Sequence, residues 1–308
     1  MNSSAVRIGT RASPLARWQA NWVADQLRAL QVTVELVLIT TQGDVQQQGP
    51  IGDIGTSGVF TKELQRALLD NRIDLAVHSL KDLPTDVVPG LSLAAVPVRE
   101  SHRDALLSRT GLPLLALPAG AKIGTGSMRR SSQLLHARQD LQIADVRGNV
   151  DTRLRKLHDG EYDALILAEA GLRRLGLDSQ ITELLPLESF LPAIGQGALG
   201  LETRENDTAT RALLQPIDDP ATHASVLAER GMLAALRGGC LAPIGGWARI
   251  DASGKLHLEG TVLNPSGTER RYASAGRAIG QPVQLGQQVA KLLLDQGAAE
   301  LINSARKA

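Results

Sequence analysis

Residues 6–40 read VRIGTRASPLARWQANWVADQLRALQVTVELVLIT, and this stretch decides the fold class. It begins with VRIGTR (6–11), a short segment that predicts a β-strand. Ser13 and Pro14 then supply an N-cap and a proline at the first helical position, and apolar residues recur after them at helical spacing. The run 32–40 is almost continuously apolar, which is typical of a strand covered on both faces. The stretch therefore predicts a β-α-β unit.

The same alternation of strands and helices continues and then restarts near residue 120. A helix through Phe60 and Leu68 leads into the strand IDLAVHS (73–79). The second series consists of a strand at 121–126, a helix at 127–138, a strand at 141–147, a helix at 149–160 capped by Asn149, and a strand at 162–168. Strands that alternate with helices predict a parallel, doubly wound sheet, so we expect two α/β domains of similar size.

The last third of the chain has a different pattern. The segment LPAIGQGALGLETR (191–204) predicts a crossing or hinge that ends in a strand. A helix at 221–236 is followed by strands at 247–250, 255–263 and 269–276 and by a helix over 283–304. We therefore expect a small α+β domain at 220–308, a first α/β domain formed by 1–97 with 198–215, and a second α/β domain at 103–191.

The composition is that of an ordinary globular protein, with 43% hydrophobic and 21% charged residues among 308. No signal peptide and no apolar run near the ~20 residues of a membrane span are found, so we expect a cytoplasmic protein without a membrane partner. The formal charge of +1 gives no indication of a nucleic-acid partner. Aromatic residues are too scarce to favour single-strand binding.

Basic residues gather between Ala121 and Lys156, where eight of them stand against three acidic residues. Arg129 and Arg130 follow GTGS at a strand-to-helix turn, where free backbone N–H groups favour an anion, and Arg147 ends the next strand. Ligands of open α/β sheets bind at such strand ends. A single arginine there is more often part of a solvated helix face, but the group together predicts an anion site.

Two further residues are candidates for chemistry. Asp82 in HSLKDLP (78–84) follows a predicted strand and is either a catalytic carboxylate or a turn residue. Cys240, the single cysteine, lies in RGGCLAPIG (237–245). A lone thiol is commonly a small buried hydrophobe, but the two glycines and Arg237 favour an exposed, reactive thiolate.

Other site classes lack their patterns. A third glycine is missing from the dinucleotide-like GTGSMR, and no GxxxxGK[ST] loop is present. The six histidines are scattered, so no metal site is expected.

The chain resembles the porphobilinogen deaminase (hydroxymethylbilane synthase) family over nearly its whole length. The resemblance rests on RIGTRASPLA, AVHSLKDLPT, RGNVDTRL, EYDALILAEAGLRRLGL, LPAIGQGALG and RGGCLAPIG, which occur in the family's order. It implies two α/β domains like those of periplasmic binding proteins and a smaller α+β domain that carries the cysteine.

The resemblance also implies an activity. Cys240 would hold a dipyrromethane cofactor through a thioether, and four porphobilinogen molecules would be condensed head to tail on it, with loss of ammonia, into hydroxymethylbilane. Asp82 would be the catalytic residue. The implied binding residues are Arg11, Ser13, Ser79 and Lys81 in the first domain and Thr125, Ser127, Arg129, Arg130, Arg147, Arg153, Arg174 and Gln196 in the second. We also expect a monomer that hands its product to the next enzyme of the pathway.

This chain departs from the family pattern at a few positions. Ser57 and Asp53 stand where lysines are usual, Gln42 replaces an arginine, and Gly126 replaces a serine. Our hypothesis is that closure of the loop 49–60 relies less on cationic contacts here.

Two alternatives remain beside the deaminase interpretation. A non-enzymatic, two-lobed anion-binding module would show the same α/β pattern. Phosphate-ester chemistry would use the arginines but would explain neither Asp82 nor Cys240.

Overall fold

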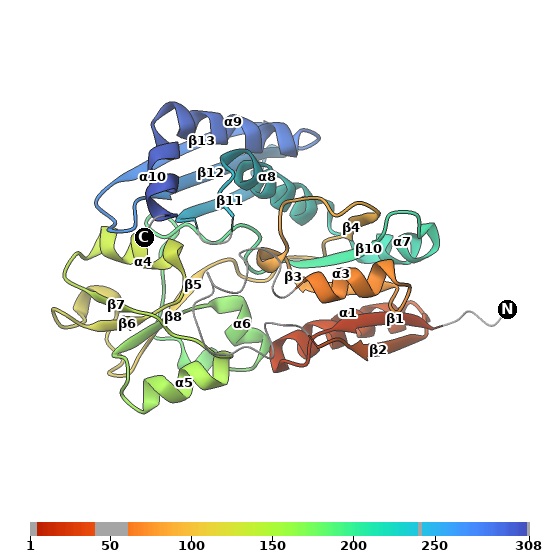
Figure 1. The fold of residues 1–308 in the computed structure, drawn as a ribbon, viewed down its shortest axis with the longest axis horizontal. Coiled ribbons are helices and arrows are strands. Elements are labelled where there is room, and N and C mark those ends of the chain that lie inside the picture. The colour runs from red at the N-terminus through yellow and green to blue at the C-terminus, as the bar shows by residue number, and fades with distance from the viewer. Residues whose placement is uncertain (1–4, 41–60, 240–241, 307–308) are drawn as a thin grey trace. The chain divides into compact units, whose positions relative to one another are not determined.

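The computed structural model describes residues 5–40, 61–239 and 242–306. The chain divides into two compact units, Met1–Glu100 with Ala198–His223 and Ser101–Gly197 with Ala224–Ala308. Three sheets are found in the described residues: one in the first unit and two in the second (Figure 1).

The first unit is built on a five-stranded mixed sheet in the order β2-β1-β3-β10-β4. Its elements are β1 (Val6–Thr10), α1 (Pro14–Ala29), β2 (Val34–Leu38), α3 (Lys62–Leu69), β3 (Leu75–Ser79), the 3₁₀ turn η2 (Leu80–Asp82), β4 (Leu91–Ala95), β10 (Leu199–Arg204), α7 (Thr208–Leu214) and η5 (Gln215–Ile217). β1 runs parallel to β2 and β3, whereas β10 is antiparallel to β3 and β4. The sheet therefore contains strands from both sides of the segment Ser101–Gly197: β1 to β4 precede that segment and β10 follows it.

The start of α1 confirms the predicted cap. The Ser13 hydroxyl accepts a hydrogen bond from the Ala16 N–H, and Pro14 is the first helical residue. The apolar side of α1 packs on one face of the sheet, in a cluster that includes Ile8, Leu27 and Leu75. Local sequence thus fixes where α1 begins, and core packing holds its N-terminus beside the end of β1.

The second unit contains another five-stranded mixed sheet, in the order β7-β6-β8-β5-β9. Its elements are β5 (Asp104–Ser108), η3 (Leu114–Ala116), β6 (Lys122–Gly124), α4 (Met128–Ala137), β7 (Gln142–Ala144), α5 (Val150–His158), β8 (Ala164–Ala168), α6 (Glu169–Arg174), η4 (Asp178–Gln180) and β9 (Glu183–Leu184). The predicted cap of α5 is confirmed, because the Asn149 side chain accepts from the Thr152 N–H at 2.9 Å.

The two sheets have equivalent topologies, and the predicted fold class is confirmed. In each sheet three parallel strands lie side by side, and the next strand in the sheet is β10 in the first and β5 in the second. Each of these two strands is the first one formed after the chain has passed from one sheet to the other. The expectation of wholly parallel sheets is wrong in this detail, since β10 and β5 run antiparallel to both of their neighbours. Strand direction in these positions is set by the crossings, which local periodicity does not reveal.

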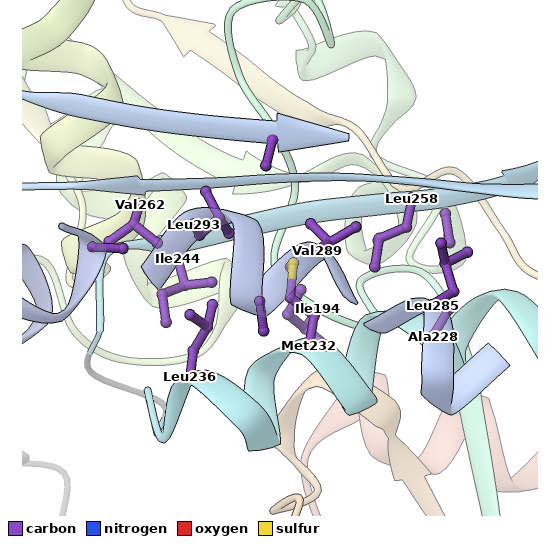
Figure 2. Packing of buried hydrophobic residues seen from close by; sticks show 14 of the residues in the cluster. Ile194, Ala228, Met232, Leu236, Ile244, Leu258, Val262, Leu285, Val289 and Leu293 are labelled. Atoms are coloured by element: carbon purple, nitrogen blue, oxygen red, sulfur yellow. The ribbon is translucent and has the colours of Figure 1, made fainter. Parts of the chain in front are cut away.

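The rest of the second unit is a small α+β layer pair. The antiparallel strands β11 (Ile244–Ile250), β12 (Lys255–Leu263) and β13 (Arg270–Ala278) pack against α8 (Pro220–Leu236), α9 (Pro282–Asp295) and α10 (Ala298–Ala305). Figure 2 shows Met232 of α8 and Val289 of α9 pointing into the same apolar core as Leu258 of β12. The first strand of this sheet, β11, begins at Ile244, near the end of the sequence segment 237–245 that contains the single cysteine.

The single helix expected over 283–304 is two helices. α9 ends at Asp295, and Gly297 has φ +88°, a left-handed conformation that glycine adopts without a steric cost. The chain therefore turns between α9 and α10, and both helices still reach the core through Leu293 and Leu301.

Candidate active site

A pocket in the first unit opens where β1 and β3 end. It is lined by Arg11, Ser13, Leu15, Ala16, Gln19, Thr61, Leu64, Val77, His78, Ser79 and Asp82. The structure thus brings together Arg11, Ser13, Ser79 and Asp82, which the sequence predicted as site residues. The carboxyl ends of parallel strands and the N-terminus of α1 meet here, as expected for a ligand site in an open α/β sheet.

Local hydrogen bonds hold the Asp82 turn at this edge. Asp82 ends η2 directly after β3, and its side chain is half-buried. The Leu80 N–H donates to the Ala198 carbonyl at 3.0 Å, and the Leu83 N–H donates to the Leu80 carbonyl at 3.1 Å. Lys81 lies on the same turn but outside the pocket lining. The carboxylate therefore sits on a fixed turn rather than on a free loop.

The pocket wall contains buried polar groups. The Gln19 amide donates to the Ser79 hydroxyl at 2.8 Å, and Gln19 is buried. The Thr61 hydroxyl is also buried, and it has no hydrogen-bond partner among the described residues. A buried hydroxyl without a partner is costly, so its place in a pocket wall indicates a site for a polar ligand.

The predicted arginine pair of the second unit is buried against an aspartate. Arg129 and Arg130, in the first turn of α4, are only 4% and 8% exposed. Asp104, the first residue of β5, is 1% exposed and accepts from Arg129 Nη1 at 2.7 Å and from Arg130 Nη2 at 2.8 Å. These three residues, which we call the Asp104 cluster, carry a net charge of +1.

The charges of the Asp104 cluster support one another. Burial alone would raise the pKa of Asp104, but attraction to Arg129 and Arg130 outweighs burial and holds that pKa well below its usual range. Burial lowers the pKa of Arg130, against the opposing attraction of Asp104. Asp104 therefore stays ionised at neutral pH.

The two arginines differ in what they can still bind. Arg130 uses Nε and Nη2 on Asp104 and Nη1 on the Ile166 carbonyl at 3.1 Å. Arg129 uses Nη1 on Asp104 and on the Leu191 carbonyl, while its buried Nε has no partner among the described residues. Arg129 therefore keeps a donor for an added carboxylate, and Arg130 mainly holds the cluster together.

The other predicted residues of the second unit lie around the carboxyl ends of β6 and β7 or behind the cluster. Thr125 accepts from the Ser127 N–H at 3.2 Å in the turn before α4. Arg147 Nε donates to Asp145 at 2.7 Å, and Arg153 Nε donates to the Gly148 carbonyl at 2.9 Å. These contacts order the turn between β7 and α5.

Arg174 and Gln196 act inside the protein. Arg174 is buried and donates to the Gly197 carbonyl at 2.7 Å. Gln196 is fully buried, donates to Asp104 at 3.0 Å and accepts from Arg130 at 3.3 Å. Gln196 thus belongs to the network that supports the Asp104 cluster.

Several predictions lie outside the described residues. They concern Cys240 and the loop positions Gln42, Asp53 and Ser57. The glycine preceding the cysteine is described, and Gly239 has φ +62°, a left-handed backbone that explains the choice of glycine there.

At Gly126 a Cβ atom would approach an Asp145 carboxylate oxygen to 2.8 Å. A serine there would require the Asp145 side chain to shift.

Sequence reasoning did not predict Asp104, or Gln19 and His78 in the pocket lining. Asp104 opens the otherwise apolar strand DALLS, and a charge in such a position is a signal for a buried partner. The partner itself could not be named, because α4 meets β5 only in the folded unit.

Two further searches concern metals and membranes. Among the described residues no group of three or more His, Cys, Asp or Glu side chains is placed to hold a metal ion. In the same residues no helix is both long and apolar enough to cross a membrane.

Comparison with known proteins identifies the family to which the chain belongs. Residues 6–212 match the model of the porphobilinogen deaminase, dipyromethane cofactor binding domain, and residues 223–295 match that of the porphobilinogen deaminase C-terminal domain. The chain belongs to the porphobilinogen deaminase family. The deaminase of Syntrophotalea carbinolica is 47% identical over 304 residues, covering 98% of this chain and 96% of its own. That of Acidithiobacillus ferrooxidans is 48% identical over 306 residues, covering 99% of both chains.

Solved structures also include more distant likenesses to this deaminase chain. A periplasmic sulfonate-binding protein from Methylobacillus flagellatus is similar with a TM-score of 0.37 and 16% identity, over 76% of this chain and 68% of that one.

Proposed function

We propose that this deaminase condenses four porphobilinogen molecules head to tail, with loss of one ammonia per molecule, and that one water then releases the chain as hydroxymethylbilane. The observation that carries the proposal is the Asp82 pocket, where a fixed carboxylate lies beside Arg11 and Ser13 in a family member matched over nearly its full length. A pyrrole with acetate and propionate side chains offers N–H donors for the carboxylate and anions for the arginine.

The role proposed for Asp82 follows from charge. Loss of ammonia from the aminomethyl group leaves positive charge on the methylene pyrrole, and an ionised carboxylate stabilises that charge as it develops. The substrate would be oriented by Ser13, which caps α1, and by Ser79 and Lys81, which precede Asp82 at the end of β3 and in η2. The C–C bond then forms at the free α-carbon of the preceding ring, which loses a proton.

The family's dipyrromethane cofactor is held, in our proposal, through a thioether to Cys240. When bound, it would supply the free pyrrole α-carbon at which the first C–C bond forms. The donor set fits this polycarboxylate, because Arg129 has a buried Nε without a partner in the described part of the chain. Thr125, Ser127, Arg147 and Arg153 surround the same strand ends and would take further carboxylates.

Arg174 and Gln196, among the predicted binding residues, are proposed to act through the Asp104 cluster. We further propose three domains with the boundaries 1–97 with 198–215, 103–191 and 220–308. A monomeric, cytoplasmic enzyme that hands its product to the next enzyme of the pathway completes the proposal.

The test is turnover of porphobilinogen by the wild-type protein and two matched variants. Asp82→Asn removes the carboxylate charge, and Asp86→Asn removes one from an exposed residue nearby. We expect wild type and Asp86→Asn to consume porphobilinogen equally and release one ammonia per molecule, and Asp82→Asn to lose about 100-fold or more in kcat. No ammonia from the wild type, or full activity of Asp82→Asn, would contradict the proposal.

A further inference from the structure

A buried polar network lies directly behind the Asp82 pocket. Nε2 of His78, on β3, is hydrogen-bonded to Oε2 of Glu202, on β10, at 2.9 Å. The other oxygen of Glu202 accepts from the Gln65 amide of α3 at 3.0 Å. His78 and Glu202 are only 4% and 5% exposed, and Gln65 is buried as well. Three elements therefore bring three polar side chains to one point of an otherwise apolar interior.

Stability alone does not explain why such a network is present. Buried ionisable pairs can often be replaced by apolar residues of similar volume without loss of stability, because burying the charges costs about as much as their attraction returns. The adjoining residues of β3, from Leu75 to Val77, are buried and apolar. A polar group at position 78 is therefore better explained by what it does at the pocket.

The hydrogen bonds define the imidazole tautomer. An amide N–H can only donate, so Glu202 is an acceptor toward Gln65, and as a carboxylate it is an acceptor toward His78 too. Nε2 of His78 therefore carries the hydrogen, and Nδ1 of the neutral ring is an acceptor. Nδ1 has no hydrogen bond to the described residues, and His78 lines the same pocket as Asp82.

The proposed condensation needs a proton acceptor. The α-carbon that forms the new C–C bond must lose its proton after the bond has formed, and a second acceptor in the pocket would leave Asp82 ionised for the next cationic methylene pyrrole. The titratable or charged side chains in the pocket lining are Arg11, His78 and Asp82, with Glu202 behind them. An imidazole is the group among these that can take a proton on one ring nitrogen while the N–H of the other stays hydrogen-bonded.

We propose that His78 accepts the proton released from the pyrrole α-carbon, with Glu202 and Gln65 as its positioning residues. The inference rests on the proposed deaminase function. The proton passes to Nδ1 while Nε2–H stays bonded to Glu202, and the released ammonia then takes it from the imidazolium to leave as ammonium. Because the aminomethyl group of the substrate enters as ammonium, protons and charge balance in each condensation without any further reactant.

The first test measures turnover of the cofactor-loaded protein. His78→Gln keeps an amide N–H for Glu202 but cannot take the proton, and we expect it to lower kcat about 100-fold with KM within threefold of wild type. Added imidazole should raise the activity of His78→Ala at least tenfold. The control is His257→Gln, whose imidazole makes an exposed 2.7 Å contact with Asp251 and which should behave as wild type.

Loading is checked separately, by intact mass, and a variant that lacks the cofactor is reconstituted with hydroxymethylbilane before assay. Wild-type protein that does not consume porphobilinogen would refute the deaminase function itself. A His78→Gln protein that stays within fivefold of wild-type kcat, or a His78→Ala protein without imidazole rescue, would refute only the role of His78.

The second test needs no turnover. The ¹⁵N NMR signals of His78, assigned by their loss in His78→Gln, should show a protonated Nε2 and an unprotonated Nδ1 in the neutral ring. Glu202→Gln should shift this tautomer balance. A neutral His78 protonated at Nδ1 would overturn the proposal.

Discussion

Replacing Asp104 by asparagine should remove the charge that holds two buried arginines. Asp104 accepts hydrogen bonds from Arg129, Arg130 and Gln196, and all four residues are buried. Asparagine has the same shape but one acceptor oxygen and an NH₂ group, which would face arginine donors. The substitution therefore creates both an uncompensated charge and a donor–donor conflict.

The magnitude follows from burial. Removing one partner of a buried ion pair costs about 3–5 kcal/mol, and the 1% exposure of Asp104 places this substitution within that range. At about 4 kcal/mol the melting temperature would fall by roughly 8–16 °C. An exposed pair would not respond in this way: Lys291 and Asp295 on α9 are joined at 2.7 Å, and losing that pair should cost about 0.5 kcal/mol or less.

The assay is urea or thermal unfolding of wild type, Asp104→Asn and Asp295→Asn, with far-UV circular dichroism as the signal that monitors unfolding. We expect Asp104→Asn to unfold much earlier, while Asp295→Asn overlays wild type. If both variants lost less than about 1 kcal/mol, the buried cluster would not hold the second unit together, and its arginines would be available in full for ligands.

Two further predictions concern stability elsewhere. Hydrogen bonds from Arg7 and Arg204 outweigh the burial that would raise the pKa of Asp74 and instead lower it from 3.8 to about 2. Because this pKa is lowered on folding, ionised Asp74 stabilises the folded protein above about pH 4, and this stabilisation is lost as the pH falls toward 2. After allowance for solvent screening we expect it to contribute about 1–2 kcal/mol to the free energy of unfolding. The same pH dependence should be absent from Asp74→Asn. A Cβ on Gly286 would lie 2.3 Å from the Ala228 carbonyl oxygen, so Gly286→Ala should cost about 1–3 kcal/mol by calorimetry, whereas Gly280→Ala, which meets open space, should change stability by less than about 0.5 kcal/mol. A Gly286→Ala protein as stable as wild type would show that α8 and α9 can move apart freely.

Local signals predicted local structure well. The caps of α1 and α5 were found from Ser13 and Asn149, because each side chain bonds to an N–H three residues away. The directions of β5 and β10 were missed, because they depend on crossings between segments about a hundred residues apart. Periodicity reports which faces are buried but not which strand lies beside which.

The candidate site divides in the same way. Motifs brought out Asp82, Arg11 and the arginine pair, because each motif lies at a strand end and strand ends gather at one edge of a sheet. Asp104 was not predicted, and neither was the burial of the arginines against it. Nothing near Asp104 in the sequence says which cation it will meet, since the pairing is formed by the packing of α4 on β5.

The central claim is that Cys240 carries a covalent dipyrromethane on which the condensation proceeds. The most direct test is the intact mass of the purified protein beside its Cys240→Ser variant, each measured before and after incubation with porphobilinogen. The account predicts an added mass equal to two linked pyrrole units that is present only when the thiol is present. A wild-type mass equal to the bare polypeptide, and unchanged by porphobilinogen, would contradict it.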